Sequence, residues 1–193
     1  LTRSSAASDV YKRQAVLRDG TTRLKKDGEI IHHHSGVAGF AEYAVLPKEA
    51  LVRIDKHIPF EHAALFGCGV VTGVGAVINT ASAREEDSIA IVGLGGVGLS
   101  ALLASIAIGS KKTIAIDLSN EKLNLAHELG ADHILNPNDA NFLERVRDLT
   151  SGGANIAIET AGSGRALKTA YDITRRGGTV SYTHLRAHET DRY

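Results

Sequence analysis

The clearest chemistry in this sequence lies in a glycine-rich turn and an acidic residue that follows it. Gly93, Gly95 and Gly98 have the spacing G-x-G-x-x-G, and Asp117 comes after them at close to the ~20 residues expected in a dinucleotide-binding unit. Such glycines turn the chain tightly and let backbone N–H groups approach a pyrophosphate at the start of a helix. The carboxylate of Asp117 would hold the adenosine ribose. The alternative is an ordinary glycine turn, because many loops need glycine.

The segments around this turn are those that a nucleotide site requires. Apolar residues predict a buried strand at 89–92, a helix at 97–108 and a second strand at 113–117, which ends in Asp117. This order places the glycines at the carboxyl end of a strand, where open α/β sheets bind ligands. The context therefore favours a nucleotide site over a simple turn.

The same alternation continues towards the end of the chain, which predicts an α/β fold with a Rossmann-type doubly wound parallel sheet. A complete sheet of this type has six strands in the order 3-2-1-4-5-6, and here we expect it to be truncated near the fifth. Further strands are predicted at 133–135, at 155–159 and from 178 onward, and further helices at 120–129, 140–149 and 164–174.

The segment before the glycine turn has a different character. Residues 15–46 favour short strands joined by turns of the Asp-Gly type, and a helix is expected to start at the proline and acid of 59–61. The small residues that follow suggest close backbone packing. The predicted features are turns at Asp19-Gly20 and Asp27-Gly28, a strand at 40–46, close packing over 67–75 and a helix through 76–80.

Composition narrows the class of protein. Lys plus Arg and Asp plus Glu number 22 each, so no net charge draws the chain to nucleic acid or to a membrane surface, and we expect neither as a partner. The glycines and serines among residues 89–108 favour a strand and helix over a membrane span. A single cysteine excludes an internal disulfide framework and suits a reducing, cytoplasmic location.

Both ends of the chain look foreign to the rest. The sequence contains no methionine, and the segments LTRSSAASDVYKRQ and SYTHLRAHETDRY resemble translated sequencing-adapter sequence without a helical or strand period. The alternative is a pair of polar tails, which is common at termini. We therefore expect an internal fragment with four parts: a non-native-looking tail at 1–14, a partial β-rich domain at 15–66, an incomplete nucleotide-binding domain at 67–180 and a second tail at 181–193.

Taken together, the motifs resemble the zinc-containing medium-chain alcohol dehydrogenases, and most closely the glutathione-dependent formaldehyde and aryl-alcohol dehydrogenase branch. This resemblance implies a GroES-like β-rich catalytic domain before the Rossmann domain, NAD and zinc as cofactors, an alcohol or aldehyde as substrate, and a homo-oligomeric intact protein. The motifs are LRDGTTR (17–23), IHHHSGVAGFAEY (31–43), GCGVVTGVGA (67–76), GLGGVG (93–98) and AIDLSNEK (115–122).

Cys68 is the metal ligand that the resemblance implies. Thiolate binds zinc well, and a catalytic zinc keeps a position open for the alcohol, whose alkoxide it stabilises. The two other protein ligands of the family, a cysteine and a histidine, would lie upstream of residue 1. The alternative is a buried structural cysteine, which is the usual state of a lone cysteine.

The resemblance implies roles for four further residues. Gly96 and Val97 complete the phosphate-binding turn, Thr72 would pack near the nicotinamide, and Lys122 would reach the adenosine ribose. The alternatives are an ordinary helix threonine for Thr72 and a solvated helix lysine for Lys122. Glu159 falls where the family backbone passes near the cofactor, and we do not expect it to act as a catalytic acid.

Three hypotheses about function remain open. The leading one is a fragment of a zinc-dependent, NAD-linked alcohol dehydrogenase that is inactive as written, since one thiolate cannot hold a catalytic zinc. The second is a nucleotide-binding module without zinc chemistry. The third, a zinc-free quinone or enoyl reductase, is disfavoured by Cys68. Asp117 predicts a preference for NAD over NADP, because a carboxylate repels the 2′-phosphate.

Overall fold

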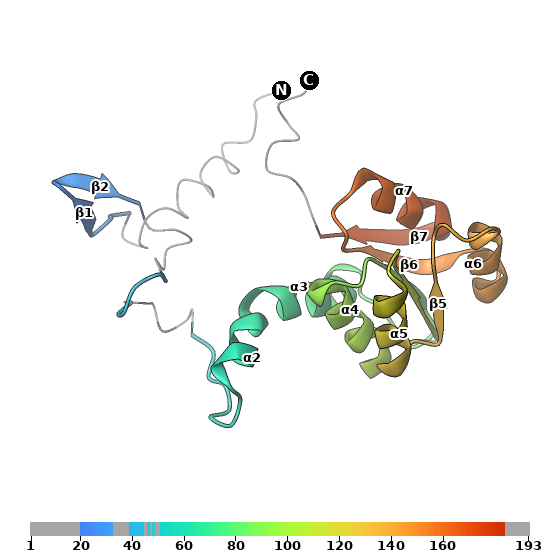
Figure 1. The fold of residues 1–193 in the computed structure, drawn as a ribbon, viewed down its shortest axis with the longest axis horizontal. Coiled ribbons are helices and arrows are strands. Elements are labelled where there is room, and N and C mark those ends of the chain that lie inside the picture. Colours follow the sequence, from blue (N-terminus) through green and yellow to red (C-terminus); the bar gives the residue numbers. More distant parts are fainter. Residues whose placement is uncertain (1–19, 33–38, 45, 47, 49–50, 184–193) are drawn as a thin grey trace, which may run out of the picture. The chain divides into compact units, whose positions relative to one another are not determined.

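A computed structural model describes residues 20–32, 39–44, 46, 48 and 51–183 (Figure 1). The chain divides into two compact units, Leu1–Asp55 and Lys56–Tyr193, which we describe separately. The contact-based division falls earlier in the chain than the boundary between residues 66 and 67, which stays a prediction. That boundary falls inside a continuous helix, and a helix is a poor place for a domain boundary because its turns are hydrogen-bonded to one another.

The described part of the first unit contains an antiparallel hairpin of β1 (Leu24–Lys26) and β2 (Glu29–Ile31). Asp27 and Gly28 have φ values of 52° and 84°, as the tight turn of a two-residue hairpin requires. The predicted turn at Asp27-Gly28 is confirmed, whereas Asp19 of the other predicted turn lies outside the described residues. The predicted strand at 40–46 is wrong over residues 40–44, which bend at 40–42 and pair with no described strand.

The second unit begins with one long helix. It comprises α2 (Phe60–Leu65), the wider π-helical segment η3 (Phe66–Val70), α3 (Val71–Gly75) and a second π-helical segment η4 (Ala76–Thr80). Pro59 occupies the N-cap, which confirms the predicted start. The close packing predicted for residues 67–75 is confirmed at Gly73: a Cβ there would lie 2.2 Å from the carbonyl oxygen of Val97, at the start of the next helix.

A doubly wound parallel sheet follows, as predicted. Its strands lie in the order β5-β4-β3-β6-β7, which corresponds to 3-2-1-4-5, and every neighbouring pair is parallel. The elements are β3 (Ser88–Val92), α4 (Gly96–Ala107), β4 (Lys112–Ile116), α5 (Asn120–Glu128), β5 (His133–Leu135), α6 (Phe142–Thr150), β6 (Ala154–Glu159), α7 (Gly164–Ile173) and β7 (Thr174–Tyr182).

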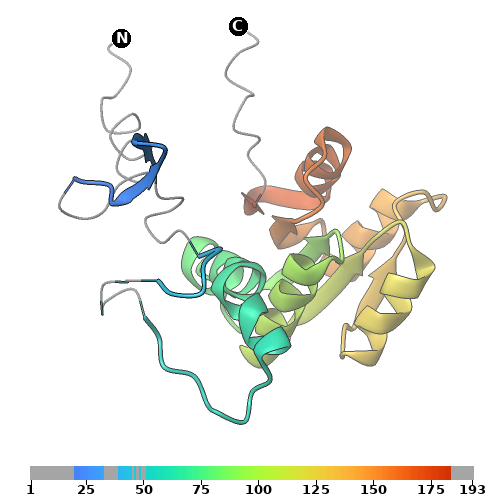
Figure 2. The same ribbon diagram turned by 60° about the vertical axis from the view of Figure 1, so that its left-hand side comes forward.

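Helices cover both faces of this sheet (Figures 1 and 2). Because side chains alternate along a strand, Ile89 and Ile91 of β3 join one apolar core, with residues of η4, α4 and α5, while Ala90 and Val92 join the other, with α6 and α7. β3 is therefore buried on both sides, and its carboxyl end is fixed between two layers of helices. The loop that leaves this end is the glycine turn.

The last strand extends further than predicted. β7 pairs Ser181 with Ile158 and Tyr182 with Glu159, and Ser181 is buried, so the expected start of a tail at residue 181 is wrong by two residues. The ladder of β6 reaches as far as Glu159 and offers these residues backbone partners, which is the reason for the extension. Residues 184–193 and the predicted tail at 1–14 lie outside the described part.

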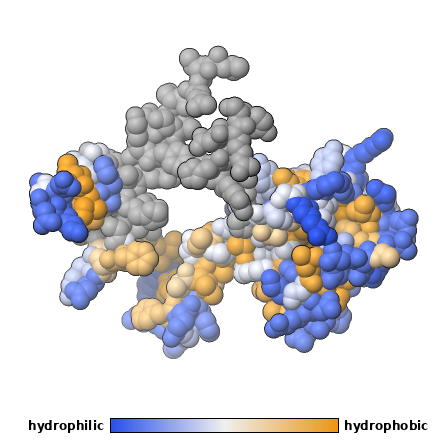
Figure 3. All heavy atoms as spheres, turned by 45° about the horizontal axis from the view of Figure 1, so that its top comes forward, coloured by the Kyte–Doolittle hydropathy of each residue, from blue (hydrophilic) through white to orange (hydrophobic). Residues whose placement is uncertain are grey.

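The long helix Phe60–Thr80 exposes an apolar surface (Figure 3). Within the described part of the chain it is the one helix with the length and composition of a membrane span. A single helix of this kind is weak evidence for a membrane, because helices of soluble proteins pass the same test. Its exposed large apolar residues are Phe60, Leu65, Phe66, Val71 and Ile78.

Candidate functional site

The glycine turn has the geometry that its spacing predicts. Gly93 has φ +97°, and a Cβ there would lie 2.8 Å from the Cβ of Ala161 in the neighbouring loop. A Cβ at Gly98 would lie 1.9 Å from the carbonyl oxygen of Gly93, so the turn and the first turn of α4 touch backbone to backbone. Only glycine fits at either position.

The glycines at the top of the turn face open space instead. Apart from the adjoining residues and the backbone of α4, no described part of the protein lies within 4 Å of a Cβ at Gly95 or Gly96, and both residues are exposed. Gly95 is the N-cap of α4 and gives it no side-chain cap. The first N–H groups of a helix have no intrahelical acceptor, so this exposed end of α4 can accept an anion. The half-buried Val97 follows in the same turn of helix.

Asp117 lies just beyond the end of β4 and holds the glycine turn directly. Its Oδ2 accepts a hydrogen bond from the N–H of Leu94 at 2.7 Å, and its Oδ1 accepts one from the N–H of Ser119 at 2.9 Å. A carboxylate has about four lone-pair positions, so two of them remain for other donors. The backbone thus fixes the carboxylate while leaving it able to bind two ribose hydroxyls.

Lys122 lies beside this carboxylate, on the first turn of α5. Its Nζ is 3.8 Å from Oδ2 of Asp117, and its side chain is about half exposed. The Ser119 hydroxyl caps α5 by accepting a hydrogen bond from the N–H of Lys122. An ion pair this long and exposed adds little stability, so the ammonium group is free to turn towards a ligand.

These residues border one cleft of about 370 Å³ at the carboxyl ends of the strands. One wall comes from the glycine turn and from Asp117, and the opposite wall comes from the loop after β6 and from α7. A cleft at the point where the chain leaves β3 and β6 in opposite directions is where α/β sheets bind nucleotides. Its lining includes Gly93, Leu94, Gly95, Asp117, Leu118, Lys122, Pro137, Thr160, Ala161, Ser163, Arg165 and Thr169.

The residues present fit a dinucleotide. The open space above Gly95 and Gly96 lets a pyrophosphate reach the backbone, and the spare lone pairs of Asp117 lie at the ribose end of the same cleft. No basic side chain follows Asp117 directly, since Leu118 and Ser119 come next. The cleft is therefore suited to a ribose with free hydroxyls.

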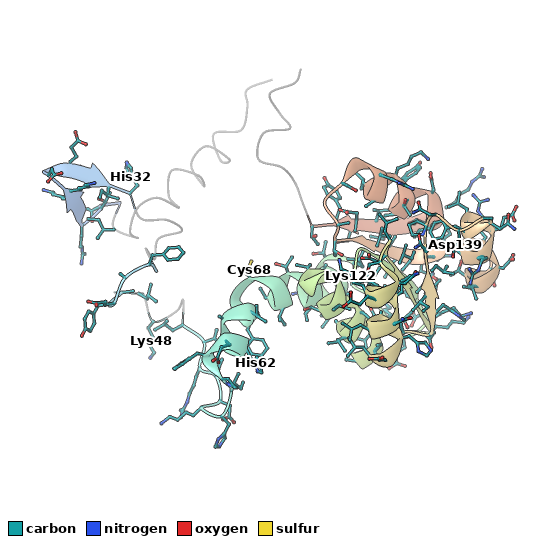
Figure 4. The ribbon with its side chains drawn as sticks, in the orientation of Figure 1. His32, Lys48, His62, Cys68, Lys122 and Asp139 are labelled. Carbon is teal, nitrogen blue, oxygen red and sulfur yellow. The ribbon has the colours of Figure 1, made fainter. Side chains whose placement is uncertain are left out.

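The structure does not bring Cys68 and Thr72 into this cleft. Cys68 is exposed in the π-helical segment η3, which corrects the alternative of a buried structural cysteine, and Thr72 lies half-buried one turn further along the helix. Thr72 instead borders a separate hollow with the end of β7. Figure 4 shows Cys68 on the long helix, away from Lys122.

Zinc does not fit the described residues alone. Over the described ranges, no group of three or more His, Cys, Asp or Glu side chains converges on one point. Cys68 offers one thiolate, and a catalytic zinc takes about three protein ligands. The assignment of Cys68 as a zinc ligand therefore stays a prediction, and no catalytic step is derived through the metal.

Sequence reasoning missed part of the cleft. Arg165, at the start of α7, donates from Nη2 to Oδ1 of Asn138 at 2.5 Å and so bridges to the loop after β5. Thr160 is buried and bonds to the glycine turn. The loop after β6 follows a strand of the same parallel sheet as β3, so the rule that ligands bind at the carboxyl ends of such strands would have pointed to it.

Fold and cleft together define a Rossmann-type dinucleotide-binding domain. The chain belongs to the zinc-binding dehydrogenase family, whose sequence pattern it matches over residues 96–191. It is 34% identical over 166 residues to the S-(hydroxymethyl)glutathione dehydrogenase of Synechocystis, covering 85% of this chain and 45% of that protein.

Two solved structures are also similar to this chain. A protein described as an alcohol dehydrogenase zinc-binding domain protein from Burkholderia ambifaria superposes with a TM-score of 0.77 at 32% identity, covering 94% of this chain and 52% of that one. Benzyl alcohol dehydrogenase from Acinetobacter calcoaceticus superposes with a TM-score of 0.76 at 32% identity, covering 86% of this chain and 47% of that one. The chain thus spans about half the length of the relatives it matches.

Proposed function

We propose that this chain is the cofactor-binding part of a zinc-dependent alcohol dehydrogenase that transfers hydride between an alcohol and NAD. One observation carries the proposal: the hydrogen bond from Leu94 N–H to Asp117 joins the phosphate-binding turn to the ribose-binding carboxylate at one cleft. Family membership supplies the reaction class, and the relatives' names include alcohol dehydrogenases.

The residues of the chain divide the cofactor between them. The N–H groups at the start of α4, beginning with Gly96 and Val97, bind the pyrophosphate, and Gly95 and Gly96 let it approach. Asp117 accepts hydrogen bonds from the ribose hydroxyls, and Lys122 adds a donor at the edge of the same ribose. When bound, NAD supplies the nicotinamide ring that takes the hydride from the alcohol.

The catalytic half is proposed from the resemblance. Cys68 would be one of three zinc ligands, and Thr72, one helical turn away, would pack near the nicotinamide. The substrate class is an alcohol or aldehyde, in line with the names of the relatives. We further propose that the intact protein is a cytoplasmic homo-oligomer that binds neither nucleic acid nor membrane, which agrees with its balanced charge.

A nucleotide-binding module without zinc chemistry is the second candidate function. It rests on the cofactor cleft, whose lining residues need no metal to bind a nucleotide. Both functions share the cofactor cleft, and they differ in whether a full-length version binds zinc at Cys68.

Titration with reduced cofactors tests the proposal. The 193-residue chain should bind NADH, seen as a change in NADH fluorescence, at least ~10-fold more tightly than NADPH, since a carboxylate facing a phosphate costs about 1.4 kcal/mol or more. Equal affinities would contradict the assignment of Asp117. Zinc analysis of a version extended to the length of its relatives then separates the two functions: bound zinc that is lost in Cys68→Ala supports the dehydrogenase.

A further inference from the structure

The glycine turn is held from both of its neighbouring strands. On the β4 side, the carbonyl oxygen of Ile116 accepts the N–H of Gly93 at 2.8 Å. On the β6 side, the Thr160 hydroxyl lies 2.5 Å from the carbonyl oxygen of Gly93 and 3.2 Å from that of Val92, and the Thr160 N–H donates to Val92 at 2.9 Å. Both hydrogen-bonding groups of Gly93 are therefore used.

The Thr160 hydroxyl is tightly packed. Its oxygen would lie 2.7 Å from a Cβ at Gly98, so it sits between the turn and the first turn of α4. Thr160 is only 7% exposed, so water cannot easily replace the hydroxyl. Without it, the carbonyl of Gly93 would lose its side-chain donor in a buried place.

The loop that carries Thr160 is itself fixed. Oε1 of the buried Glu159 accepts the N–H of Ala161 at 2.8 Å and of Gly162 at 2.7 Å. The backbone carbonyl of Glu159 accepts the N–H of Thr183 at 3.1 Å. A hydroxyl on an anchored loop can restrain its partner, whereas one on a free loop would move with it.

We propose that Thr160 is a positioning residue for pyrophosphate binding: by holding the carbonyl of Gly93, its hydroxyl keeps the N–H groups at the start of α4 aimed into the cleft. The inference rests on the proposed binding of NAD and extends it to a residue on the facing wall. If instead Thr160 is only a satisfied buried hydroxyl, its loss lowers stability without any selective effect on the pyrophosphate.

Three variants distinguish these roles. Thr160→Val keeps the shape and removes the hydroxyl, and Thr160→Ser keeps the hydroxyl. Thr174→Val is the matched control: the Thr174 hydroxyl donates to the carbonyl of Ala170 at 2.7 Å, at the opposite end of the sheet from the cleft. For each variant, NADH and adenosine affinities and the free energy of unfolding in urea are measured.

Thr160→Val should weaken NADH binding about tenfold while adenosine binding changes less than about twofold, and Thr160→Ser should stay within about twofold of the parent for both. Thr174→Val should lose stability without changing either affinity. Equal losses of NADH affinity in Thr160→Val and Thr174→Val would overturn the proposal. So would a Thr160→Ser variant as weak as Thr160→Val.

A measurement on the free protein separates this inference from the proposed function. Amide hydrogen exchange of Leu94 and Leu99, whose N–H groups bond to Asp117 and to Gly95, reports the order of the turn. Thr160→Val should speed both exchanges selectively relative to Thr174→Val, and unchanged exchange would overturn the positioning role. Failure of the parent chain to bind NADH would refute the proposed function, while the exchange rates would still decide the role of Thr160.

Discussion

Replacing Asp117 with glycine should alter both cofactor choice and cofactor affinity. The substitution removes the charge that repels a 2′-phosphate, so the preference for NADH over NADPH should fall from at least ~10-fold to within about threefold. It also removes the acceptor for the N–H groups of Leu94 and Ser119. Asp117→Gly should therefore not simply exchange one cofactor for the other.

The size of the second effect follows from the two hydrogen bonds. A hydrogen bond to a charged group contributes about 1.5–3 kcal/mol, and the Asp117 side chain is only 11% exposed, so screening by water is limited. Loss of both bonds should lower the free energy of unfolding by about 3–6 kcal/mol. NADH affinity should fall by a further order of magnitude or more, because both the ribose contact and the order of the turn are lost.

Asp132 provides the control for this prediction. Its Oδ2 accepts two hydrogen bonds from Thr113, from N–H at 2.7 Å and from the hydroxyl at 2.8 Å, near the start of β4 and away from the cleft. Asp132→Gly should lose comparable stability in a urea titration with the ratio of NADH to NADPH affinities unchanged. If Asp117→Gly kept the parent ratio, or if Asp132→Gly changed it equally, the assignment of Asp117 as the selecting residue would be refuted.

Three further outcomes are expected. Gly95→Ala should fold with stability within about 0.5 kcal/mol of the parent, because its Cβ would meet no described residue beyond its neighbours in the chain. It should weaken NADH binding at least ~10-fold by blocking the pyrophosphate, and normal NADH binding would contradict this site. Gly98→Ala should lower the unfolding midpoint strongly, since its Cβ would lie 1.9 Å from the carbonyl oxygen of Gly93, and a parent-like midpoint in urea would show the packing to be wrong. Cys68→Ser should leave the stability of the 193-residue chain within about 0.5 kcal/mol, because the thiol is exposed, whereas a loss above ~2 kcal/mol would indicate a packing role.

The nucleotide-binding fold could be predicted because its signals are local. The apolar run of β3, the glycines after it and the acid at the end of β4 each fix one feature of a βαβ unit. The structure matches the predicted segments of this unit within about one residue, whereas β7 starts four residues before the predicted 178. The order of the sheet was predicted from the order 3-2-1-4-5-6 that sheets of this type share.

The features that were missed depend on contacts between distant segments. A strand forms only where another strand pairs with it, so the sequence pattern at 40–44 was not enough to form a strand there. In contrast, pairing with β6 extends β7 beyond residue 180. The role of Thr160 likewise comes from a carbonyl 67 residues away in sequence. Cys68 was recognised only through a family motif, because one cysteine has no spacing from which a metal site can be inferred.

The central claim is that NADH binds in the cleft between the glycine turn and the loop after β6. Backbone amide chemical shifts of the 193-residue chain, recorded by NMR during titration with NADH, test it most directly. The account predicts the largest changes at Gly95, Gly96, Asp117 and Thr160. Changes confined to a different hollow of this unit, such as the one lined by His133 and Asp148 beside β5, would contradict it. So would the absence of changes at saturating NADH.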